Sequence, residues 1–230
     1  MARLSVVATP IGNMNDITLR ALDTLKSADL VLCEDTRTTA KLLEKYDIHT
    51  ATMSYHAHSG ISKVDKIIEY LKDGKDLALV SDAGTPGISD PGAELVARIR
   101  SEMSEAIIAG ALKIEAIPGA SALTAGLSIA GVLCSDFTFL GFMPHKKGRE
   151  SLFKEIAESK RTYVFYESPH RILKALQSLK DFCPEKKVTI CRELTKIFEE
   201  VVSGSVNEVA EYFGNNPEKV RGEFVVIVYK

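Results

Sequence analysis

Short apolar runs alternate with segments of helical period through the first half of this 230-residue chain. Runs of four to six apolar residues indicate strands, and apolar residues spaced three and four apart indicate helices. We expect strands over 3–8, 29–33, 50–54, 77–81 and 113–117 and helices over 18–26, 36–45, 61–72 and 90–102. Strands joined in this way by helices form a mainly parallel sheet, so the fold class is α/β.

The order of elements changes after Pro118-Gly119. Helices are expected over 120–131, 149–158, 168–180 and 205–213, and strands over 137–141, 161–166, 187–191, 196–203 and 223–229. The strands over 196–203 and 223–229 flank the last of these helices, which suggests a mixed sheet. With a boundary near 114–119, we expect an N-terminal α/β domain over 1–116 and a C-terminal domain over 117–230.

Composition excludes several classes of protein. A formal net charge of -2 rules out a global basic field, so nucleic-acid contacts must come from local clusters. The four cysteines lack metal-ligand spacing and are expected to be buried thiols. A strand that begins at residue 3 leaves no room for a leader peptide. The apolar window 120–133 is too short to span a bilayer, so we expect it to form a buried helix. We therefore expect a soluble cytoplasmic protein.

The segment 77–92 (LALVSDAGTPGISDPG) predicts a buried strand, a tight loop and a helix start. Three glycines and two prolines lie in the nine residues 84–92, which leaves backbone amides free to face a polar ligand. Asp90 is expected to be the helix N-cap, with Pro91 at the first helical position. The loop lacks the Lys and Ser/Thr of a P-loop, and no Gly-x-Gly-x-x-Gly run follows a strand, so the usual nucleotide sites are excluded.

Polar clusters follow several of the expected strands, where open parallel sheets bind their ligands. They are residues 9–13, 34–37, 81–92, 118–122 and 166–171. Each one by itself is most often a helix cap or a turn. Their common position at strand ends points to a ligand site.

In sequence these segments resemble the tetrapyrrole methylase-like S-adenosylmethionine (SAM) methyltransferases, within them the branch of ribosomal RNA small-subunit methyltransferase I. The matching segments are 7–13 (VATPIGN), 34–39 (EDTRTT), 81–92, 118–122 (PGASA), 141–144 (GFMP), 166–171 (YESPHR) and 192–196 (RELTK). The resemblance implies a class III methyltransferase fold, a parallel-sheet domain followed by a mixed-sheet domain that completes a SAM cleft. It also implies a homodimer that methylates the ribose 2′-oxygen of a decoding-centre cytidine in 16S rRNA, with SAM as methyl donor and no metal.

The resemblance also assigns residues to the cofactor. Those implied to surround the methionyl part of SAM are Pro10, Asp82, Ala83, Gly84 and Gly87; those implied to hold the adenosine are Ser121, Ala122, Tyr166, Glu167 and Leu194. Two departures stand out. The segment 56–60 (HAHSG) lacks the Asn-Glu expected after its first histidine, and the sequence ends without the small helical extension expected from many relatives.

Removal of the ribose proton requires a base or a cation that stabilises the anion. Candidate catalytic residues form two clusters, Glu34, Asp35 and Arg37 in one and Arg192, Glu193 and Lys196 in the other, and the sequence does not choose between them. Our hypothesis is that Glu34 or Asp35 orients the hydroxyl and that Arg37 and Lys196 lie on the RNA side. A buried salt-bridge network is the structural alternative for each of them.

Further RNA contacts are expected from the basic clusters at 145–149, 160–161 and 171–174, all of a kind that also occurs on ordinary solvated surfaces. The irregular spacing of His49, His56 and His58 argues against a zinc site. Two other functions stay open: a methyltransferase that acts on a small tetrapyrrole, and a non-catalytic ribosome assembly protein.

Overall fold

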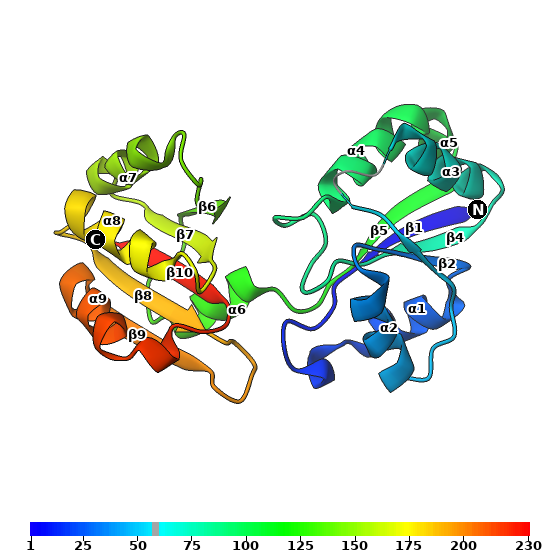
Figure 1. Cartoon of the computed structure of the whole chain (residues 1–230). Coiled ribbons are helices and arrows are strands. Elements are labelled where there is room, and N and C mark those ends of the chain that lie inside the picture. The colour runs from blue at the N-terminus through cyan, green and yellow to red at the C-terminus, as the bar shows by residue number, and fades with distance from the viewer. Residues whose placement is uncertain (57–59) are drawn as a thin grey trace. The chain divides into compact units, whose positions relative to one another are not determined.

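The computed structural model describes residues 1–56 and 60–230 (Figure 1). The chain divides into two compact units, Met1–Ser121 and Ala122–Lys230. Each unit contains one five-stranded sheet.

The sheet of the first unit is parallel throughout, in the order β3-β2-β4-β1-β5. Its strands are β1 (Ala2–Val7), β2 (Leu30–Cys33), β3 (Thr52–Ser54), β4 (Asp76–Leu79) and β5 (Leu112–Ile117). The buried residues of the inner strands are almost all aliphatic, as expected for a sheet covered on both faces. The prediction of a parallel α/β sheet is confirmed.

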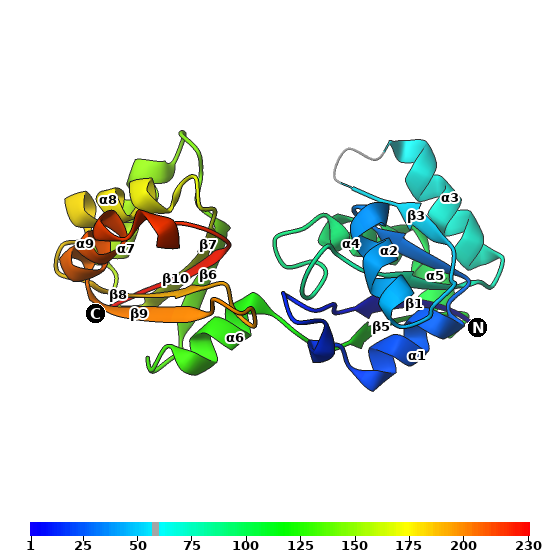
Figure 2. The ribbon, with the colours of Figure 1, turned by 60° about the horizontal axis from the view of Figure 1, so that its bottom comes forward.

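Helices cover both faces of this sheet (Figures 1 and 2). The helical elements of the unit are η1 (Met14–Asp16), α1 (Leu19–Ser27), α2 (Thr36–Lys45), α3 (Ile61–Lys72), α4 (Gly92–Glu102) and α5 (Ser104–Ile108). Leu25 of α1 and Leu42 of α2 pack against one face with Val31 and Ala78. The other face packs against α3 and α4, with Ile67 and Leu95 among the buried residues.

This arrangement creates a switch point at the carboxyl ends of β1 and β4. The two strands are neighbours, but the chain leaves β1 toward α1 on one face and leaves β4 toward α4 on the other. Loops that diverge from adjacent parallel strands leave a crevice between them, and ligands of open α/β sheets bind there. The fold therefore draws attention to the residues after Val7 and Leu79.

The second unit has a mixed sheet in the order β6-β7-β10-β8-β9, as expected. Its strands are β6 (Phe137–Phe142), β7 (Thr162–Glu167), β8 (Lys187–Arg192), β9 (Glu200–Ser205) and β10 (Phe224–Tyr229). Only β6 and β7 pair in parallel. The helical elements are α6 (Ala122–Ile129), α7 (Arg149–Glu158), α8 (Ile172–Phe182), α9 (Val206–Asn215) and η2 (Pro217–Lys219).

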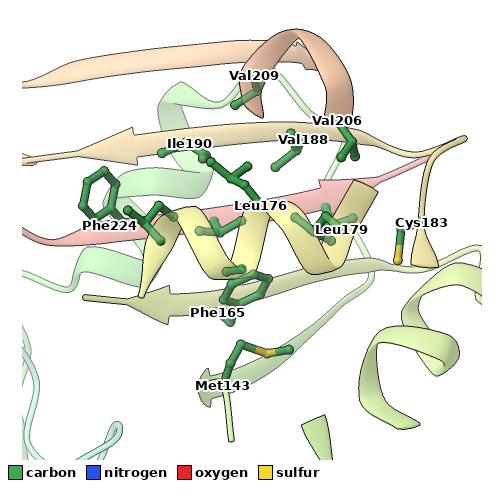
Figure 3. Close-up of a cluster of buried hydrophobic side chains, with 14 of the residues drawn as sticks. Met143, Phe165, Leu176, Leu179, Cys183, Val188, Ile190, Val206, Val209 and Phe224 are labelled. Atoms are coloured by element: carbon green, nitrogen blue, oxygen red, sulfur yellow. The ribbon is translucent and has the colours of Figure 1, made fainter. Parts of the chain in front are cut away.

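The two faces of this sheet are covered differently. Helices α7, α8 and α9 lie on one face, where Leu176 and Leu179 of α8 lie among Val188 and Ile190 of β8 (Figure 3). Helix α6 lies on the opposite face, with Gly126 against Val225. A Cβ at Gly126 would come within 3.1 Å of the Val225 side chain, so glycine permits this close approach.

Several expected boundaries are wrong. The strand expected over 196–203 begins at Glu200, because residues 193–199 form a turn in which Glu193 and Thr195 have φ values of +50° and +66°. The helix expected from residue 168 begins at Ile172, after a turn in which the Ser168 carbonyl accepts the Arg171 amide. The five-residue helix α5 was not expected.

The apolar window 120–133 is also not a buried helix. Helix α6 ends at Ile129, and Gly126 is its one buried residue. Leu133 beyond it is 96% exposed. In the described part of the chain, no helix has the length and apolar character needed to cross a bilayer.

Candidate functional site

Three loops meet at the carboxyl edge of the first sheet. Thr9 and Gly84 form an isolated bridge, with the Thr9 amide 2.9 Å from the Gly84 carbonyl and the Gly84 amide 3.0 Å from the Thr9 carbonyl. The Thr85 hydroxyl donates to the Ala120 carbonyl at 3.1 Å. The loops after β1, β4 and β5 are thus joined directly, and three of the clusters predicted at strand ends lie together.

Glycines make this close contact possible. Gly84 has φ +80°, which favours glycine, and a Cβ there would lie 3.3 Å from the Ile11 side chain. A Cβ at Gly119 would come within 3.0 Å of the Ala8 Cβ, tighter than nearly all natural contacts. The backbone at this edge is therefore held closer than side chains would allow.

Three glycine amides of this loop, those of Gly84, Gly87 and Gly92, have partners within the chain and do not face a ligand as expected. Asp90 Oδ1 accepts from the Gly87 amide at 2.7 Å and from the Gly92 amide at 2.8 Å. Asp90 is also not the N-cap of α4, since Pro91 holds that position and makes no side-chain cap bond. The Asp90 carboxylate instead folds the loop on itself, and Asp82, Ala83, Ile88 and Ser89 are its exposed residues.

The start of α2 contributes the second half of the site. Asp35 is its N-cap and accepts from the Arg37 amide at 2.8 Å. The Asp35 amide in turn donates to Asp82 Oδ1 at 3.1 Å, which links α2 to the loop after β4. A small pocket of about 50 Å³ opens here, lined by Thr9, Pro10, Met14, Thr38, Thr39, Leu42, Ser81 and Asp82.

The two neighbouring acids Glu34 and Asp35 differ in their electrostatics. Burial raises the pKa of Glu34, and the charges of Asp82 and Asp90 raise it further. The side-chain hydrogen bond from Arg37, followed by its backbone bond, lowers the pKa of Asp35 to about 2. Of these two acids, Glu34 therefore takes up a proton more readily, and Asp35 stays ionised.

Arg37 forms an ion pair with Asp35, and its side chain is otherwise exposed to solvent. Its Nη2 lies 2.6 Å from Asp35 Oδ2, and its side chain is 86% exposed. The exposed guanidinium stands at the rim of the site. The gathered carboxylates Glu34, Asp82 and Asp90 give the site a negative potential, which favours a ligand with positive charge.

In the second unit, the side chain of Tyr166 on β7 contacts the first turn of helix α6. Its hydroxyl accepts the Leu123 amide at 3.0 Å, and its ring packs edge-on to Phe139 and Phe142 with centroids 5.0 and 5.6 Å away. Ala122 is the first residue of α6, and the half-buried Ser121 precedes it. The structure therefore brings Tyr166 together with the 121–123 segment.

Glu167 does not share that surface. Successive side chains of a strand point to opposite faces, so Tyr166 points toward α6 and Glu167 toward α7 and α8. The Glu167 side chain is fully buried, with Arg171 Nε 3.3 Å and Arg149 Nη1 3.9 Å away. On the face that carries Tyr166, Glu167 therefore offers its main chain, and the contact of Glu167 with adenosine stays a prediction.

Leu194 and Lys196 lie in the turn before β9. Leu194 is buried, and Lys196 Nζ donates to Glu193 at 2.8 Å and to Glu223 at 3.2 Å. Burial lowers the pKa of Lys196, but the bond to Glu193 and the charge of Glu223 outweigh it and raise the pKa overall. Lys196 is a charged group held in place by two carboxylates.

Sequence reasoning missed Asp90 as the acceptor inside the loop, and Thr38 and Thr39 as pocket residues. The i to i+2 spacing of Asp90 and Gly92 fits an Asx turn as well as a cap, so that local signal was ambiguous. In residues 1–56 and 60–230, no group of three His, Cys, Asp or Glu is placed to hold a metal ion. His58 and most of the 56–60 segment lie outside the described residues.

Comparison with known proteins identifies the family to which this chain belongs. The sequence profile of the Tetrapyrrole (Corrin/Porphyrin) Methylases matches residues 3–210. The chain is 44% identical over 227 residues to "Ribosomal RNA small subunit methyltransferase I" of Neisseria meningitidis serogroup B, covering 98% of this chain and 75% of that protein. The protein of the same name from Thermotoga maritima is 40% identical over 228 residues, covering 99% and 98%.

Solved structures of similar fold are more distant in sequence. The methyltransferase CobJ matches with a TM-score of 0.70 and 18% identity, covering 100% of this chain and 93% of CobJ. The uroporphyrin-III C-methyltransferase from Thermus thermophilus, in complex with S-adenyl homocysteine, matches with a TM-score of 0.65 and 20% identity, covering 99% and 97%. At these identities the similarity shows the fold, which agrees with the two sheets described above.

Proposed function

Because this chain belongs to the tetrapyrrole (corrin/porphyrin) methylase family, we propose that it transfers a methyl group from SAM to ribosomal RNA of the small subunit. The observation that carries the proposal is identity of 40–44% over nearly the whole chain to proteins named for that activity. The uroporphyrin-III C-methyltransferase from Thermus thermophilus, which is named for a tetrapyrrole substrate, shares only 20% identity. RNA is therefore a better supported substrate than a tetrapyrrole.

We further propose that the acceptor is the 2′-hydroxyl of a decoding-centre cytidine in 16S rRNA. The reaction forms a bond from the ribose oxygen to the methyl carbon, breaks the bond from that carbon to sulfur, and releases one proton. A ribose hydroxyl holds its proton far more tightly than a carboxylic acid does, so the site must accept that proton as the new bond forms.

The chemistry of the first unit fits a cationic methyl donor. Asp82 presents an exposed carboxylate next to Pro10, and Glu34 and Asp90 add to the negative potential. A pocket of about 50 Å³ is far smaller than the ~300 Å³ at the low end for ligand pockets, so other residues must complete the site. The proposed cofactor-binding residues are Pro10, Asp82, Ala83, Gly84, Gly87, Ser121, Ala122, Tyr166, Glu167 (by its main chain) and Leu194.

In this proposal Glu34 orients the ribose hydroxyl and accepts its proton. Its raised pKa supports this role, because a base works best when its pKa lies close to the working pH. Asp35 holds the first turn of α2 and keeps Arg37 at the rim. Arg37 and Lys196 are proposed to contact RNA phosphates.

Two further parts of the proposal concern the state of the protein. We propose a homodimer, supported by large apolar side chains exposed in the second unit: Leu133, Ile197, Phe198 and Phe142. Location in the cytoplasm follows from a ribosomal substrate. Sedimentation at micromolar concentration would measure the dimer directly.

The test of the function is methyl transfer in a purified system. Small ribosomal subunits from cells that lack the gene are incubated with the protein and methyl-labelled SAM, and ribose methylation is mapped by resistance to alkaline cleavage. We expect one new resistant position, at a decoding-centre cytidine. If the protein binds SAM but no label enters rRNA, RNA is rejected as the substrate. If rRNA is labelled but alkali still cleaves it at every position, the ribose 2′-oxygen is rejected as the acceptor.

A further inference from the structure

The second unit buries a carboxylate between two arginines. The Glu167 side chain is fully buried, and its Oε1 accepts the Ser168 amide at 2.9 Å and lies 3.3 Å from Arg171 Nε. Its Oε2 lies 3.9 Å from Arg149 Nη1 and is buried without a hydrogen bond. Arg149 is 9% exposed in its side chain, and its Nε and Nη2 are likewise buried without a partner.

Both arginines also hold the loop that follows β6. Arg149 Nη1 donates to the Pro144 carbonyl at 3.2 Å. Arg171 Nη2 donates to the Met143 carbonyl, and Arg171 Nη1 lies 3.3 Å from His145 Nε2. Residues from β7, α7 and the start of α8 are thus joined to one loop through main-chain carbonyls, which hold its backbone in place.

The outer part of that loop is basic and exposed. Residues 145–148 (HKKG) are all exposed, and Gly148 has φ +82° just before α7 begins at Arg149. Lys146 and Lys147 therefore project from a loop whose base is fixed at Met143, Pro144 and Arg149. We name residues 145–148 the basic loop.

Stability alone is a weak explanation for this arrangement. Buried charges that lack some of their hydrogen bonds lose more solvation than they recover, and well-packed apolar side chains usually stabilise a core as much or more. Polar groups that weaken local packing tend to occur where function requires a fixed geometry. A backbone carbonyl can be gripped by a guanidinium but not by an aliphatic side chain.

We propose that Glu167, Arg149 and Arg171 are positioning residues that hold the basic loop in the conformation in which Lys146 and Lys147 contact RNA phosphates. The inference rests on the proposed function for its ligand. It gives Glu167 a different role from the cofactor contact expected from sequence, because its carboxylate lies on the face of the sheet opposite Tyr166.

The test is a double-mutant cycle on methylation of small ribosomal subunits. Glu167→Gln keeps the shape of the side chain but removes the charge that holds the arginines. We expect it to raise the KM for subunits about tenfold with kcat and SAM affinity within about twofold, since displacement of a contact weakens binding more than chemistry. Lys146→Gln with Lys147→Gln should raise KM similarly and lower the slope of log KM against log salt by roughly 1.4–1.8.

The cycle separates positioning from general damage. If Glu167 acts through the loop, Glu167→Gln should add nothing to KM once both lysines are replaced. Additive effects would overturn the proposal. Lys154→Gln, an exposed lysine paired with Glu150 on α7, is the charge-matched control and should leave KM unchanged.

A second readout does not depend on RNA. Trypsin cleaves after Lys146 and Lys147 only when the loop opens, so Glu167→Gln should speed cleavage there at least about fivefold relative to other sites, while Arg171→Lys should show a smaller increase. Equal cleavage rates in wild type and Glu167→Gln would overturn the positioning role. If trypsin cleaves Glu167→Gln faster but the wild-type protein does not methylate subunits, the positioning role is supported and the proposed function is rejected.

Discussion

The two units place carboxylates in opposite electrostatic settings. In the first unit, burial together with the charges of Asp82 and Asp90 raises the pKa of Glu34. In the second unit, burial also acts to raise the pKa of Glu193, but hydrogen bonds from Lys196 and the Glu223 amide reverse this and lower it overall. The first site places Glu34 near other carboxylates, whereas the second pairs Glu193 with the charged Lys196.

The difference indicates how the work is divided. An acid with a raised pKa is less stable in its ionised form and can take a proton during a reaction. An acid bonded to lysine has lost that capacity and instead fixes the lysine in space. We therefore propose that the first unit accepts the proton of the reaction and that the second positions positive charge.

Replacement of Glu34 is the strongest way to break this comparison. Glu34→Gln retains the shape but cannot accept a proton, so we expect turnover in subunit methylation to fall by about 10²–10⁴-fold, the range for loss of a general base. SAM affinity, measured by calorimetry, should change little. A variant that retains full turnover would move proton transfer elsewhere.

Asp35→Asn is the matched control. Asn caps helices as well as Asp, so α2 should stay intact and turnover at saturating subunits should remain within about threefold. The pH dependence sharpens the contrast. The rate should fall about tenfold per pH unit below the pKa of Glu34, as its carboxylate becomes protonated, and Glu34→Gln should lose this limb. An unchanged limb in Glu34→Gln would assign it to another group.

Replacement of Lys196 tests the positioning of positive charge by the second unit, and its expected effect is smaller than that of Glu34→Gln. If Lys196 contacts phosphate, Lys196→Met should raise the KM for subunits by about three- to tenfold with little change in kcat, and lower the salt slope by about 0.7–0.9. Lys113→Met, an exposed lysine of β5 paired with Glu115, should show neither effect. A large loss of turnover with unchanged KM would instead make Lys196 part of the chemistry.

Local patterns were sufficient to predict the sheets and the loops at their ends. Aliphatic runs such as 77–80 are typical of strands buried on both faces of a parallel sheet, and the glycines and prolines of 84–92 favour a loop. The meeting of Thr9 with Gly84 then follows from strand order, because β1 and β4 are neighbours. These parts depend on residues close in sequence or on one simple topological rule.

The electrostatics could not be predicted from the sequence, because they depend on residues far apart along the chain. Glu34 owes its raised pKa to burial and to Asp82 and Asp90, which are about fifty residues away. Arg149 gives no local sign that it meets Glu167 across α7 and β7. The exposure of α6 was missed for a similar reason, since an apolar composition does not say how much of a sheet will cover a helix.

The smallest expected effect concerns Glu200, the most strongly paired acid of the second unit. Burial acts to raise its pKa, but hydrogen bonds from Lys219, Tyr212 and Arg192 hold the pKa at about 2. A carboxylate with a lowered folded pKa stabilises the fold above its unfolded pKa of about 4.5, and this contribution is lost as pH falls toward 2. Glu200→Gln should therefore lower the unfolding free energy by about 1–3 kcal/mol at pH 7, measured by urea denaturation followed by circular dichroism, and by progressively less below pH ~4.5.

Glu150→Gln is the control, because it breaks an exposed ion pair on α7. It should lower the unfolding free energy by less than ~0.5 kcal/mol, both at pH 7 and below pH ~4.5. A Glu200→Gln deficit that stays constant across this pH range would show that packing rather than charge pairing sets the cost, and would remove Glu200 from the group of paired acids that distinguishes the second unit from the first.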